Sequence, residues 1–282
     1  MNVRAPLIAS TLLLSSAASS DAVAYKLYMT DGDAAACAAG DEDKCPQPLR
    51  WWRRETVFTL GQVTPGEFAL GEVRGLVEEA FDQWIDVDCA TTESPNGVIP
   101  VVTFGGNSDA VSATRPATAK AEPDNLIVFI RSSAEWQRAG NSSTWIAITK
   151  IAHDQSTGEV VDADIEVNDG GFKFSIDGSP AQGPDPEVDF LSMLVHEVGH
   201  FYGLDHSLIE DATMFATYSQ TVATATAART IEQDDKEGVC ALYTGVPTKT
   251  ATPKEEGGCH GGAGLGLFGL MGLALARSRR KA

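Results

Sequence analysis

Residues 196–207 read HEVGHFYGLDHS, and this short stretch decides how the whole chain is interpreted. It holds three of the five histidines in the 282 residues, together with one glutamate, among residues that are otherwise mostly apolar or glycine. His196 and His200 are four positions apart, so on a helix they lie on one face, one turn apart. Gly203 suits a helix end, where the chain must turn. The stretch therefore predicts a helix that ends near Gly203 and folds back to bring His206 toward the first two histidines.

Three histidines in this arrangement predict a zinc site made by His196, His200 and His206. Each imidazole can place a nitrogen about 2.0–2.1 Å from one zinc ion, and three protein ligands leave a fourth position for water, as in catalytic sites. Zinc lowers the pKa of such a water from about 15.7 toward about 7. Glu197, beside the first ligand, is predicted to take the proton as general base and to pass it to a leaving amine.

The alternative is a group of surface or core histidines with no ligand role, because HExxH also occurs on helices that hold no metal. Gly203 and His206 extend the pattern to HExxHxxGxxH, and these two fixed offsets make it far more specific. We therefore expect one catalytic zinc ion.

The remaining pattern predicts a single α/β (α+β) domain with a twisted mixed sheet of about five strands. A long amphipathic helix is expected over 65–86, opened by a capping box from Thr64 to Glu67. The stretch 169–187 is rich in glycine, aspartate and proline and is expected to be loop. Strands are expected at 56–60, 98–104, 125–130, 144–152 and 160–167, and further helices at 188–202 and 232–243.

The extended histidine motif resembles that of the metzincin metallopeptidases, and Ser207 after the third histidine is the matrixin mark within that group. Met214 stands eight residues beyond His206, where matrixins carry the methionine of the Met-turn. Without this offset, Met214 would be interpreted as an ordinary residue of the hydrophobic core. The resemblance covers about residues 48–245 and implies a metzincin-like fold with a long first helix, a zinc-site helix and a C-terminal helix.

Two further stretches carry the same resemblance. AFDQW at 80–84 is similar to the end of the first matrixin helix, and IEQDDKEGVCALY at 231–243 to the C-terminal helix. In the family, the acids matching Asp234 and Asp235 tie that helix to the Met-turn and to the mature N-terminus. The alternative is ordinary placement of acids in the first turn of a helix.

The resemblance implies a zinc endopeptidase that acts on protein or peptide substrates. The substrate would lie extended along the edge strand Trp145–Ile151 by strand addition. Tyr218 matches a wall position of the pocket beside the scissile bond, whereas Ala216 stands where matrixins usually have proline, so the side-chain preference stays open. One alternative is a catalytically silent, zinc-containing surface binding protein of the same fold, against which the intact Glu197 argues. Another is a metallohydrolase that acts on a non-peptide ester.

Additional metal sites are only hinted at. His153 falls at a ligand position of the structural zinc of vertebrate matrixins, but Asp164 replaces a second histidine there. We therefore expect no structural zinc and interpret His153 as a solvated turn residue. Calcium is one reading of the acids Asp162, Asp164, Glu166 and Asp169; the other is that alternate acids on a strand face water.

The N-terminus predicts export. Arg4 precedes an apolar run and the small-residue site Ala22-Val23-Ala24 follows, so residues 1–24 read as a signal peptide cleaved after Ala24. The alternative is a buried N-terminal helix. Residues 25–47 are small, polar and acidic and read as an irregular segment before a catalytic domain at 48–245.

The C-terminus predicts sorting to the cell surface. After a polar linker at 246–258 come Cys259, the uncharged stretch Gly261–Ala276 and the basic end RSRRK. Residues 259–282 resemble the myxobacterial MYXO-CTERM sorting tail, which is cut near the cysteine and leaves the protein on the surface. The alternative is an ordinary membrane anchor, although the uncharged run is shorter than the roughly 20 residues of a span. We expect a protein that is attached to the outer membrane or released, with membrane contact only through this tail.

The net charge limits the classes of partner that the chain can bind. The net charge is −18, and because the C-terminal tail is basic, the rest of the chain is more acidic still. Phosphate backbones repel such a surface, so nucleic acid is not expected as a partner. Separately, we expect the chain to be a monomer.

Four cysteines outside the tail are expected to pair in an exported protein. They allow three connectivities, and sequence alone does not choose among them. We favour Cys37 with Cys45, which are close in the chain, and Cys89 with Cys240, each at the end of a predicted helix.

Overall fold

The computed structural model of the chain describes residues 24–32, 34–38, 40–41, 44–66, 68–89, 99–110, 125–181, 186–218, 226–244 and 269–275. Nearly all of the predicted signal peptide, the linker at 246–258 and Cys259 lie outside these residues. In chain order the elements are β1 (Lys26–Leu27), α1 (Ala34–Ala38), β2 (Glu55–Gly61), α2 (Leu70–Ile85), β3 (Val101–Ser108), β4 (Leu126–Phe129), α3 (Ser133–Arg138), β5 (Trp145–His153), β6 (Val160–Val167), β7 (Lys173–Ser175), β8 (Glu187–Asp189), α4 (Phe190–Phe201), β9 (Leu204–Asp205), β10 (Thr217–Tyr218), η2 (Ala227–Arg229), α6 (Gln233–Tyr243) and β11 (Gly269–Leu275).

One mixed sheet organises the molecule, with strand order β10-β11-β5-β6-β4-β2-β3. The strands β2 to β6 are the five that the sequence predicts. Among them β2 pairs in parallel with β3 and β4, β4 pairs in parallel with β6, and β5 runs antiparallel to β6. Two short pairs lie apart, β1 with β9 and β7 with β8. The α+β class and its mixed five-stranded sheet are therefore confirmed.

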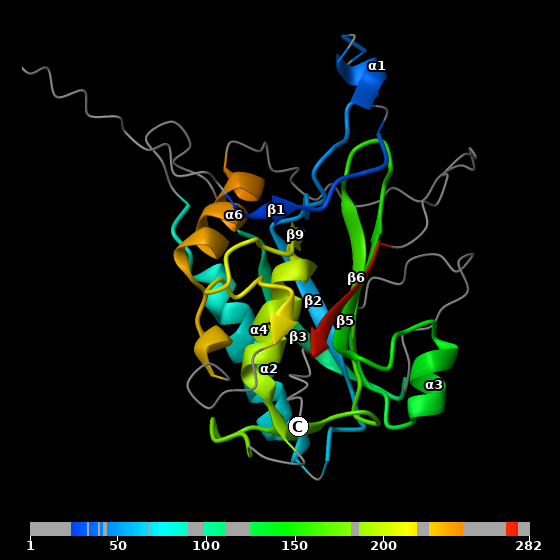
Figure 1. Cartoon of the computed structure of the whole chain (residues 1–282), viewed down its shortest axis with the longest axis vertical. Coiled ribbons are helices and arrows are strands. Elements are labelled where there is room, and N and C mark those ends of the chain that lie inside the picture. Colours follow the sequence, from blue (N-terminus) through cyan, green and yellow to red (C-terminus); the bar gives the residue numbers. More distant parts are fainter. Residues whose placement is uncertain are drawn as a thin grey trace, which may run out of the picture.

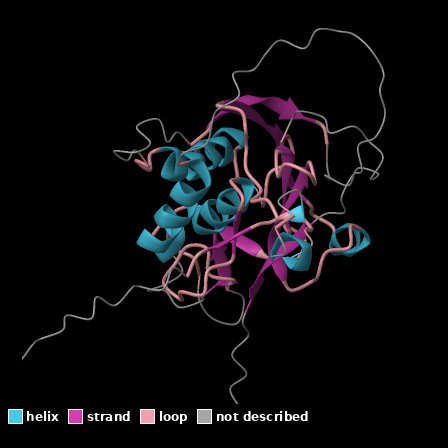
Figure 2. Cartoon of the chain, turned by 90° about the horizontal axis from the view of Figure 1, so that it is seen from above, coloured by secondary structure: helices cyan, strands magenta, loops and turns pink. Residues whose placement is uncertain are grey.

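The long helices α2, α4 and α6 lie together on one side of the sheet (Figure 1). Seen from above, they form a layer beside the strands (Figure 2). Aromatic side chains fill the space between helices: Phe81 of α2 lies 5.1 Å from Phe201 of α4, centroid to centroid. The indole of Trp84 donates a hydrogen bond to the carbonyl of Val195 at 2.9 Å. These contacts fix the histidine-bearing helix α4 against α2.

Several predicted boundaries are wrong. The helix expected from residue 65 begins at Leu70, and the hydroxyl of Thr64 donates to the carbonyl of Phe68 instead of capping a helix. The stretch 169–187, expected to be loop, contains β7 and runs into β8, which pair in parallel. The segment 25–47, expected to be irregular, contributes β1 and α1. For β1 and β7, pairing with another strand outweighs the local preference.

Two disulfides join the cysteines, Cys37 with Cys45 and Cys89 with Cys240. This is the pairing that the sequence analysis favours among three. The first closes the small loop around α1, which projects at the top of Figure 1. The second joins the chain beyond α2 to α6 across a separation of 151 residues.

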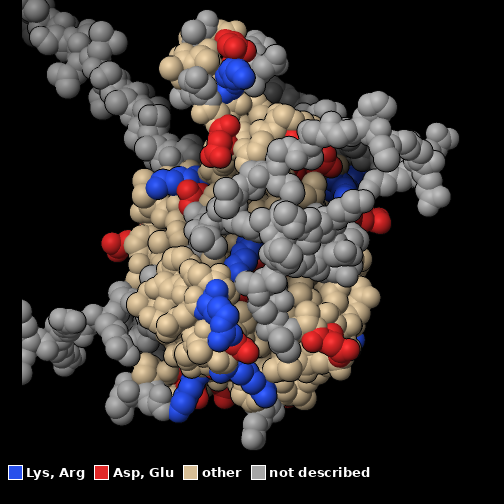
Figure 3. All heavy atoms as spheres, turned by 90° about the vertical axis from the view of Figure 1, so that its right-hand side faces the viewer, with Lys and Arg blue, Asp and Glu red and all other residues tan. Residues whose placement is uncertain are grey.

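The described surface carries charge of both signs. On the face in Figure 3, acidic and basic side chains are interspersed over the body. Among the described helices, none is both long enough and apolar enough to cross a membrane.

Candidate active site

Helix α4, which carries His196 and His200, begins at a buried carboxylate. Asp189 is 0 % exposed and accepts a hydrogen bond from the backbone N–H of Ser192 at 2.9 Å, which caps the first turn. The Arg229 guanidinium holds the same carboxylate from outside, with Nη2 2.6 Å from Oδ2. Every residue of α4 is buried. The N-cap and the packing together fix where each side chain of the HExxH stretch points.

The helix ends where the sequence predicts, and Gly203 is required there. Its φ of +104° lies in the region that favours glycine. A Cβ at this position would lie 2.1 Å from the carbonyl oxygen of Leu49. The carbonyl of Gly203 accepts a hydrogen bond from the backbone of Tyr28 at 3.0 Å. This turn sends the chain through β9 back to His206.

The three histidines come together as predicted. Their ring centroids are 4.8 to 5.3 Å apart, and one nitrogen of each lies within 4.8 Å of the others. The Nε2 atoms of His196, His200 and His206 are all buried and accept or donate no hydrogen bond. Three converging nitrogens that are withdrawn from water without a partner cost free energy unless something binds them. The donor set fits a zinc ion.

Backbone carbonyls orient two of these rings. Nδ1 of His196 lies 2.6 Å from the carbonyl oxygen of Thr213, and Nδ1 of His200 lies 2.8 Å from that of Leu204. Because a carbonyl oxygen can only accept, each Nδ1 carries the proton and each Nε2 is left with its lone pair. The hydroxyl of Tyr28 lies 3.1 Å from Nδ1 of His200 as well.

Burial keeps the histidines neutral. It lowers the pKa of His196 to about 3, with a further contribution from His206, and the hydrogen bond to Thr213 acts in the other direction. The pKa of His200 is well below its ordinary value for the same main reason, desolvation, and that of His206 is lowered less because Asp205 opposes the effect. Neutral imidazoles are the form that binds metal ions.

Glu197 is fully buried beside the trio and is held by one side chain of β5. The hydroxyl of Thr149 lies 2.6 Å from Oε2 of Glu197, whereas Oε1 is buried without a hydrogen-bond partner. Burial raises the pKa of Glu197 to about 8, and the hydrogen bonds with Thr149 lower it. One oxygen is thus anchored and the other is free to accept a proton.

The turn that carries Met214 packs against α4. Met214 is 1 % exposed, and a Cβ on Gly199 of the zinc helix would lie 2.2 Å from its sulfur, so the two are in close contact. The carboxylate of Asp235 accepts hydrogen bonds from the backbone N–H groups of Thr213 and Met214 at 2.8 and 3.0 Å. The link from the C-terminal helix to this turn therefore runs through Asp235.

Asp234 has a different contact. Its Oδ2 accepts a hydrogen bond of 2.6 Å from the hydroxyl of Ser207. The backbone N–H of Ser207 in turn donates to the carbonyl of Met214 at 2.8 Å. Asp234 thus holds the residue that follows the third histidine.

Tyr218, predicted as a pocket wall, is 7 % exposed and lies in β10. Its hydroxyl accepts a hydrogen bond of 2.7 Å from the backbone N–H of Asp189, the cap of α4. The predicted substrate strand Trp145–Ile151 lies within β5, which carries Thr149. Tyr218 and Thr149 therefore both contact α4, one at its N-cap and the other at Glu197.

The interpretation that alternate acids on this strand face water is wrong for three of the four acids, because they are buried. Asp162, Asp164 and Glu166 are 7 %, 5 % and 0 % exposed. Glu166 pairs with Nζ of Lys150 at 2.6 Å, and Asp164 accepts a hydrogen bond from the backbone of Leu126. Within the described residues, a cluster of three or more His, Cys, Asp or Glu side chains with converging ligand atoms is found at the three histidines and not at these acids. We propose no calcium site.

His153 is not a turn residue. It is the last residue of β5, is half-buried, and has Nε2 2.9 Å from the side-chain amide nitrogen of Gln155. Desolvation lowers its pKa. The interpretation as a solvated turn residue is corrected accordingly.

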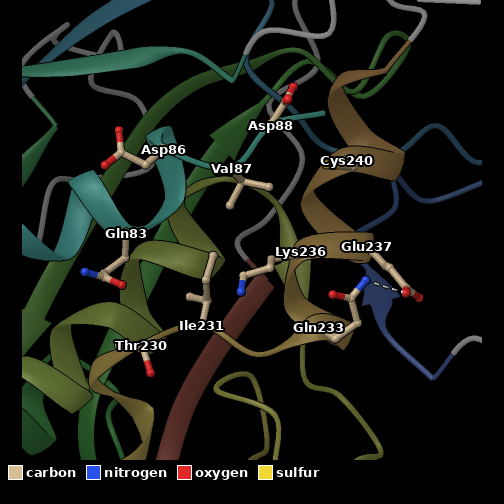
Figure 4. Close-up of a pocket in the computed structure, with 10 residues that line it drawn as sticks. All are labelled: Gln83, Asp86, Val87, Asp88, Thr230, Ile231, Gln233, Lys236, Glu237 and Cys240. Carbon is tan, nitrogen blue, oxygen red and sulfur yellow. Dashed lines mark hydrogen bonds between the residues drawn. The ribbon is translucent and has the colours of Figure 1, made fainter. Parts of the chain in front are cut away.

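A cavity of about 550 Å³ lies between the end of α2 and α6 and is separate from the histidine site. Its lining mixes apolar and polar side chains and carries both charge signs, including Asp86, Lys236 and Glu237. Gln233 is hydrogen-bonded to Glu237 at 2.8 Å (Figure 4). None of the three histidines lines it.

Sequence reasoning missed three contacts of the site. Thr149 binds Glu197, Tyr28 reaches His200, and Arg229 holds the cap of α4. Each partner is 40 or more residues away in the chain. No short-range pattern connects such residues, so no motif could have indicated them.

Comparison with known proteins agrees with this geometry. A family model described as Matrixin matches residues 118–244. Among curated proteins, Metalloendoproteinase 5-MMP of Arabidopsis thaliana is 45 % identical over 60 residues, which is 21 % of this chain and 16 % of that protein. Metalloendoproteinase 2-MMP of the same plant is 34 % identical over 80 residues, 25 % of this chain and 20 % of the relative.

A third relative, Matrix metalloproteinase-2 of Drosophila melanogaster, is 39 % identical over 66 residues, 23 % of this chain and 8 % of the fly protein. The chain thus spans a fifth or less of the length of these relatives. The family match includes the three converging histidines, Glu197 and the turn at Met214. Residues 118–244 of the chain are therefore similar to the matrixin family.

Proposed function

We propose that this protein is an exported zinc endopeptidase that hydrolyses peptide bonds in proteins or peptides. One observation carries the proposal: three imidazole nitrogens converge in a buried site without hydrogen-bond partners, and one carboxylate oxygen of the adjacent Glu197 is also buried without a partner. They are the Nε2 atoms of His196, His200 and His206 and Oε1 of Glu197. Three neutral imidazole ligands, with a carboxylate beside them that can take a proton, are the groups that a metallohydrolase needs.

The four residues are proposed to have two roles: the three histidines bind a metal ion, and the glutamate transfers a proton. His196, His200 and His206 would hold one zinc ion through Nε2. Zinc in that position would act as a Lewis acid and lower the pKa of water. Glu197, anchored to Thr149 through Oε2, takes a proton on Oε1 and delivers it to the leaving amine.

The substrate is proposed to bind as an extra strand on β5 beside the wall at Tyr218. Such binding uses backbone hydrogen bonds, so it aligns the peptide without demanding one sequence. Met214 and Asp235 are proposed to act on the site indirectly, by holding the turn that carries the carbonyl of Thr213 against His196.

The alternative is a zinc-containing binding protein without turnover. The arrangement of Glu197 disfavours it, because a buried carboxylate with a free oxygen is costly and serves no purpose in holding zinc. The metal prediction below separates the two functions.

We expect one zinc ion per chain and peptide cleavage that depends on it. Metal analysis of the purified chain should give a stoichiometry near one. A chelator should abolish cleavage of a mixed peptide library, and added zinc should restore it. His200→Ala should lose zinc, whereas His153→Ala, outside the trio, should keep it. A stoichiometry near zero in zinc-replete medium would contradict the site, near two would indicate a second one, and zinc without cleavage would favour the binding protein.

We also propose that the protein reaches the cell surface through a tail that is processed at Cys259. The export pattern at the N-terminus and the order of cysteine, uncharged run and basic end support this. Cys259→Ala should release the protein or leave its tail uncut, as judged by cell fractionation and intact mass. Ser278→Ala, also in the tail, is the matched control. Wild-type processing and location of the Cys259 variant would show that the cysteine has no such role.

A further inference from the structure

The C-terminal strand β11 occupies the edge of β5. Gly269–Leu275 runs antiparallel to β5, with Gly269 opposite Ile151 and Ala274 opposite Trp145. This is the stretch of β5 that is proposed to bind substrate. The red strand lies alongside β5 in Figure 1.

The same strand is held on its other side by the pocket wall. Ala274 and Leu275 pair in parallel with Thr217 and Tyr218 of β10. Without β11, β5 would be the edge of the five-stranded sheet and would present unpaired backbone N–H and C=O groups. The tail strand therefore fills the gap between the edge strand and the wall.

The register brings the tail to the catalytic machinery. Met271 pairs with Thr149, whose hydroxyl lies 2.6 Å from the carboxylate of Glu197. Thr149 thus pairs with β11 through its backbone and contacts the proposed general base through its side chain. A peptide substrate that used the same row of β5 would need the same N–H and C=O groups.

We propose that Gly269–Leu275 is an internal ligand of the peptide-binding edge, which excludes substrate until the strand leaves; this rests on the proposed function. The backbone groups of β5 can pair with only one strand at a time on that side, so tail and substrate compete. The strand sequence, GLMGLAL, carries no charge and no proline, so every residue can donate its N–H. It also indicates the class of peptide that this edge accepts: an extended, uncharged segment of glycine and aliphatic residues.

Because β11 is covalently linked to the domain, it competes with substrate at a high local concentration. Residues 245–268 connect α6 to β11 and can span about 80 Å when extended, far more than the radius of gyration of about 17 Å expected for a domain of this size. A tethered segment has an effective concentration on the order of millimolar. A strand that binds with a Kd of about 0.1 mM would therefore raise the apparent KM about tenfold. Removal of the tail at Cys259, as proposed above, would free the edge.

The test uses the full chain with Met271→Pro, because proline is disfavoured inside a paired strand and Met271 pairs with Thr149 of β5. Thr250→Pro, in the linker, is the matched control. Intact mass confirms that each sample retains its tail. We expect the apparent KM for an uncharged peptide to fall about tenfold in Met271→Pro, with kcat unchanged. We expect no change in Thr250→Pro.

A second measurement does not depend on catalysis. Backbone hydrogen exchange at 145–151 should be faster in Met271→Pro than in the wild type and the control, because the edge amides lose their partner. Equal exchange in all three proteins, or faster exchange with unchanged KM, would overturn the proposal. If exchange changes as expected but none of the three cleaves peptides, the tail pairing stands and the proposed endopeptidase function is what fails.

Discussion

Glu197→Gln should lower peptide cleavage by about 10²–10⁴-fold while the protein keeps its zinc. Glutamine preserves the size of the side chain and can still accept the hydrogen bond from Thr149, which is 2.6 Å long in the wild type. It cannot take a proton at neutral pH, and Glu197 is proposed to serve in both proton transfers. Cleavage of one fluorogenic peptide and zinc content should be measured on the same sample.

Glu210→Gln is the matched control, since Glu210 is an exposed glutamate close to the third histidine in the chain. It should cleave at the wild-type rate. If Glu197→Gln retains zinc and still cleaves within a few-fold of the wild type, Glu197 is not the base and the proposed mechanism is wrong.

Removal of the Cys89–Cys240 disulfide should lower the free energy of unfolding by about 5 kcal/mol, from the chain entropy of a loop of this length. The bond closes a loop across 151 residues. A loss of that size is a large share of the roughly 5–15 kcal/mol that stabilises a typical domain. It also frees α6, whose Asp235 holds the turn at Met214. Denaturant unfolding of Cys89→Ala/Cys240→Ala, with excess zinc, measures the loss.

The second disulfide provides the control. Cys37→Ala/Cys45→Ala opens a loop across only 8 residues, for which the same model gives about 2.5 kcal/mol. The Cys89–Cys240 variant should therefore unfold at a clearly lower denaturant concentration. An equal or larger loss from the Cys37–Cys45 variant would mean that loop closure is not what the long-range bond contributes.

The sequence by itself determined the parts of the site that lie close together in the chain. His196 and His200 share a helix face because of the helical repeat, and Gly203 and His206 follow within six residues. The backbone positions within such a short stretch depend on local geometry, so spacing was sufficient to bring the three residues together. The five strands of the sheet followed from apolar runs for the same reason.

The N-terminus of α2 and the pair β7–β8 could not be predicted in this way. Thr64 and Glu67 have the spacing of a capping box, yet the hydroxyl of Thr64 binds the carbonyl of Phe68 and the helix starts later. β7 lies in a stretch rich in turn residues and is a strand because it pairs with β8. For β7, the pairing with β8 outweighs a weak local preference.

Only the tertiary structure decided which groups complete the site. Thr149 meets Glu197 across 48 residues and Tyr28 meets His200 across 172, and no periodicity links such positions. The strand at 269–275 is the clearest case. Its uncharged, glycine-rich composition suits a sorting tail equally well, and its pairing with β5 depends on an edge that exists only once β5 has joined the sheet. Sequence determined the chemistry of the three ligands and the base, because that chemistry is local; the fold determined what touches them, because those contacts close long loops of chain.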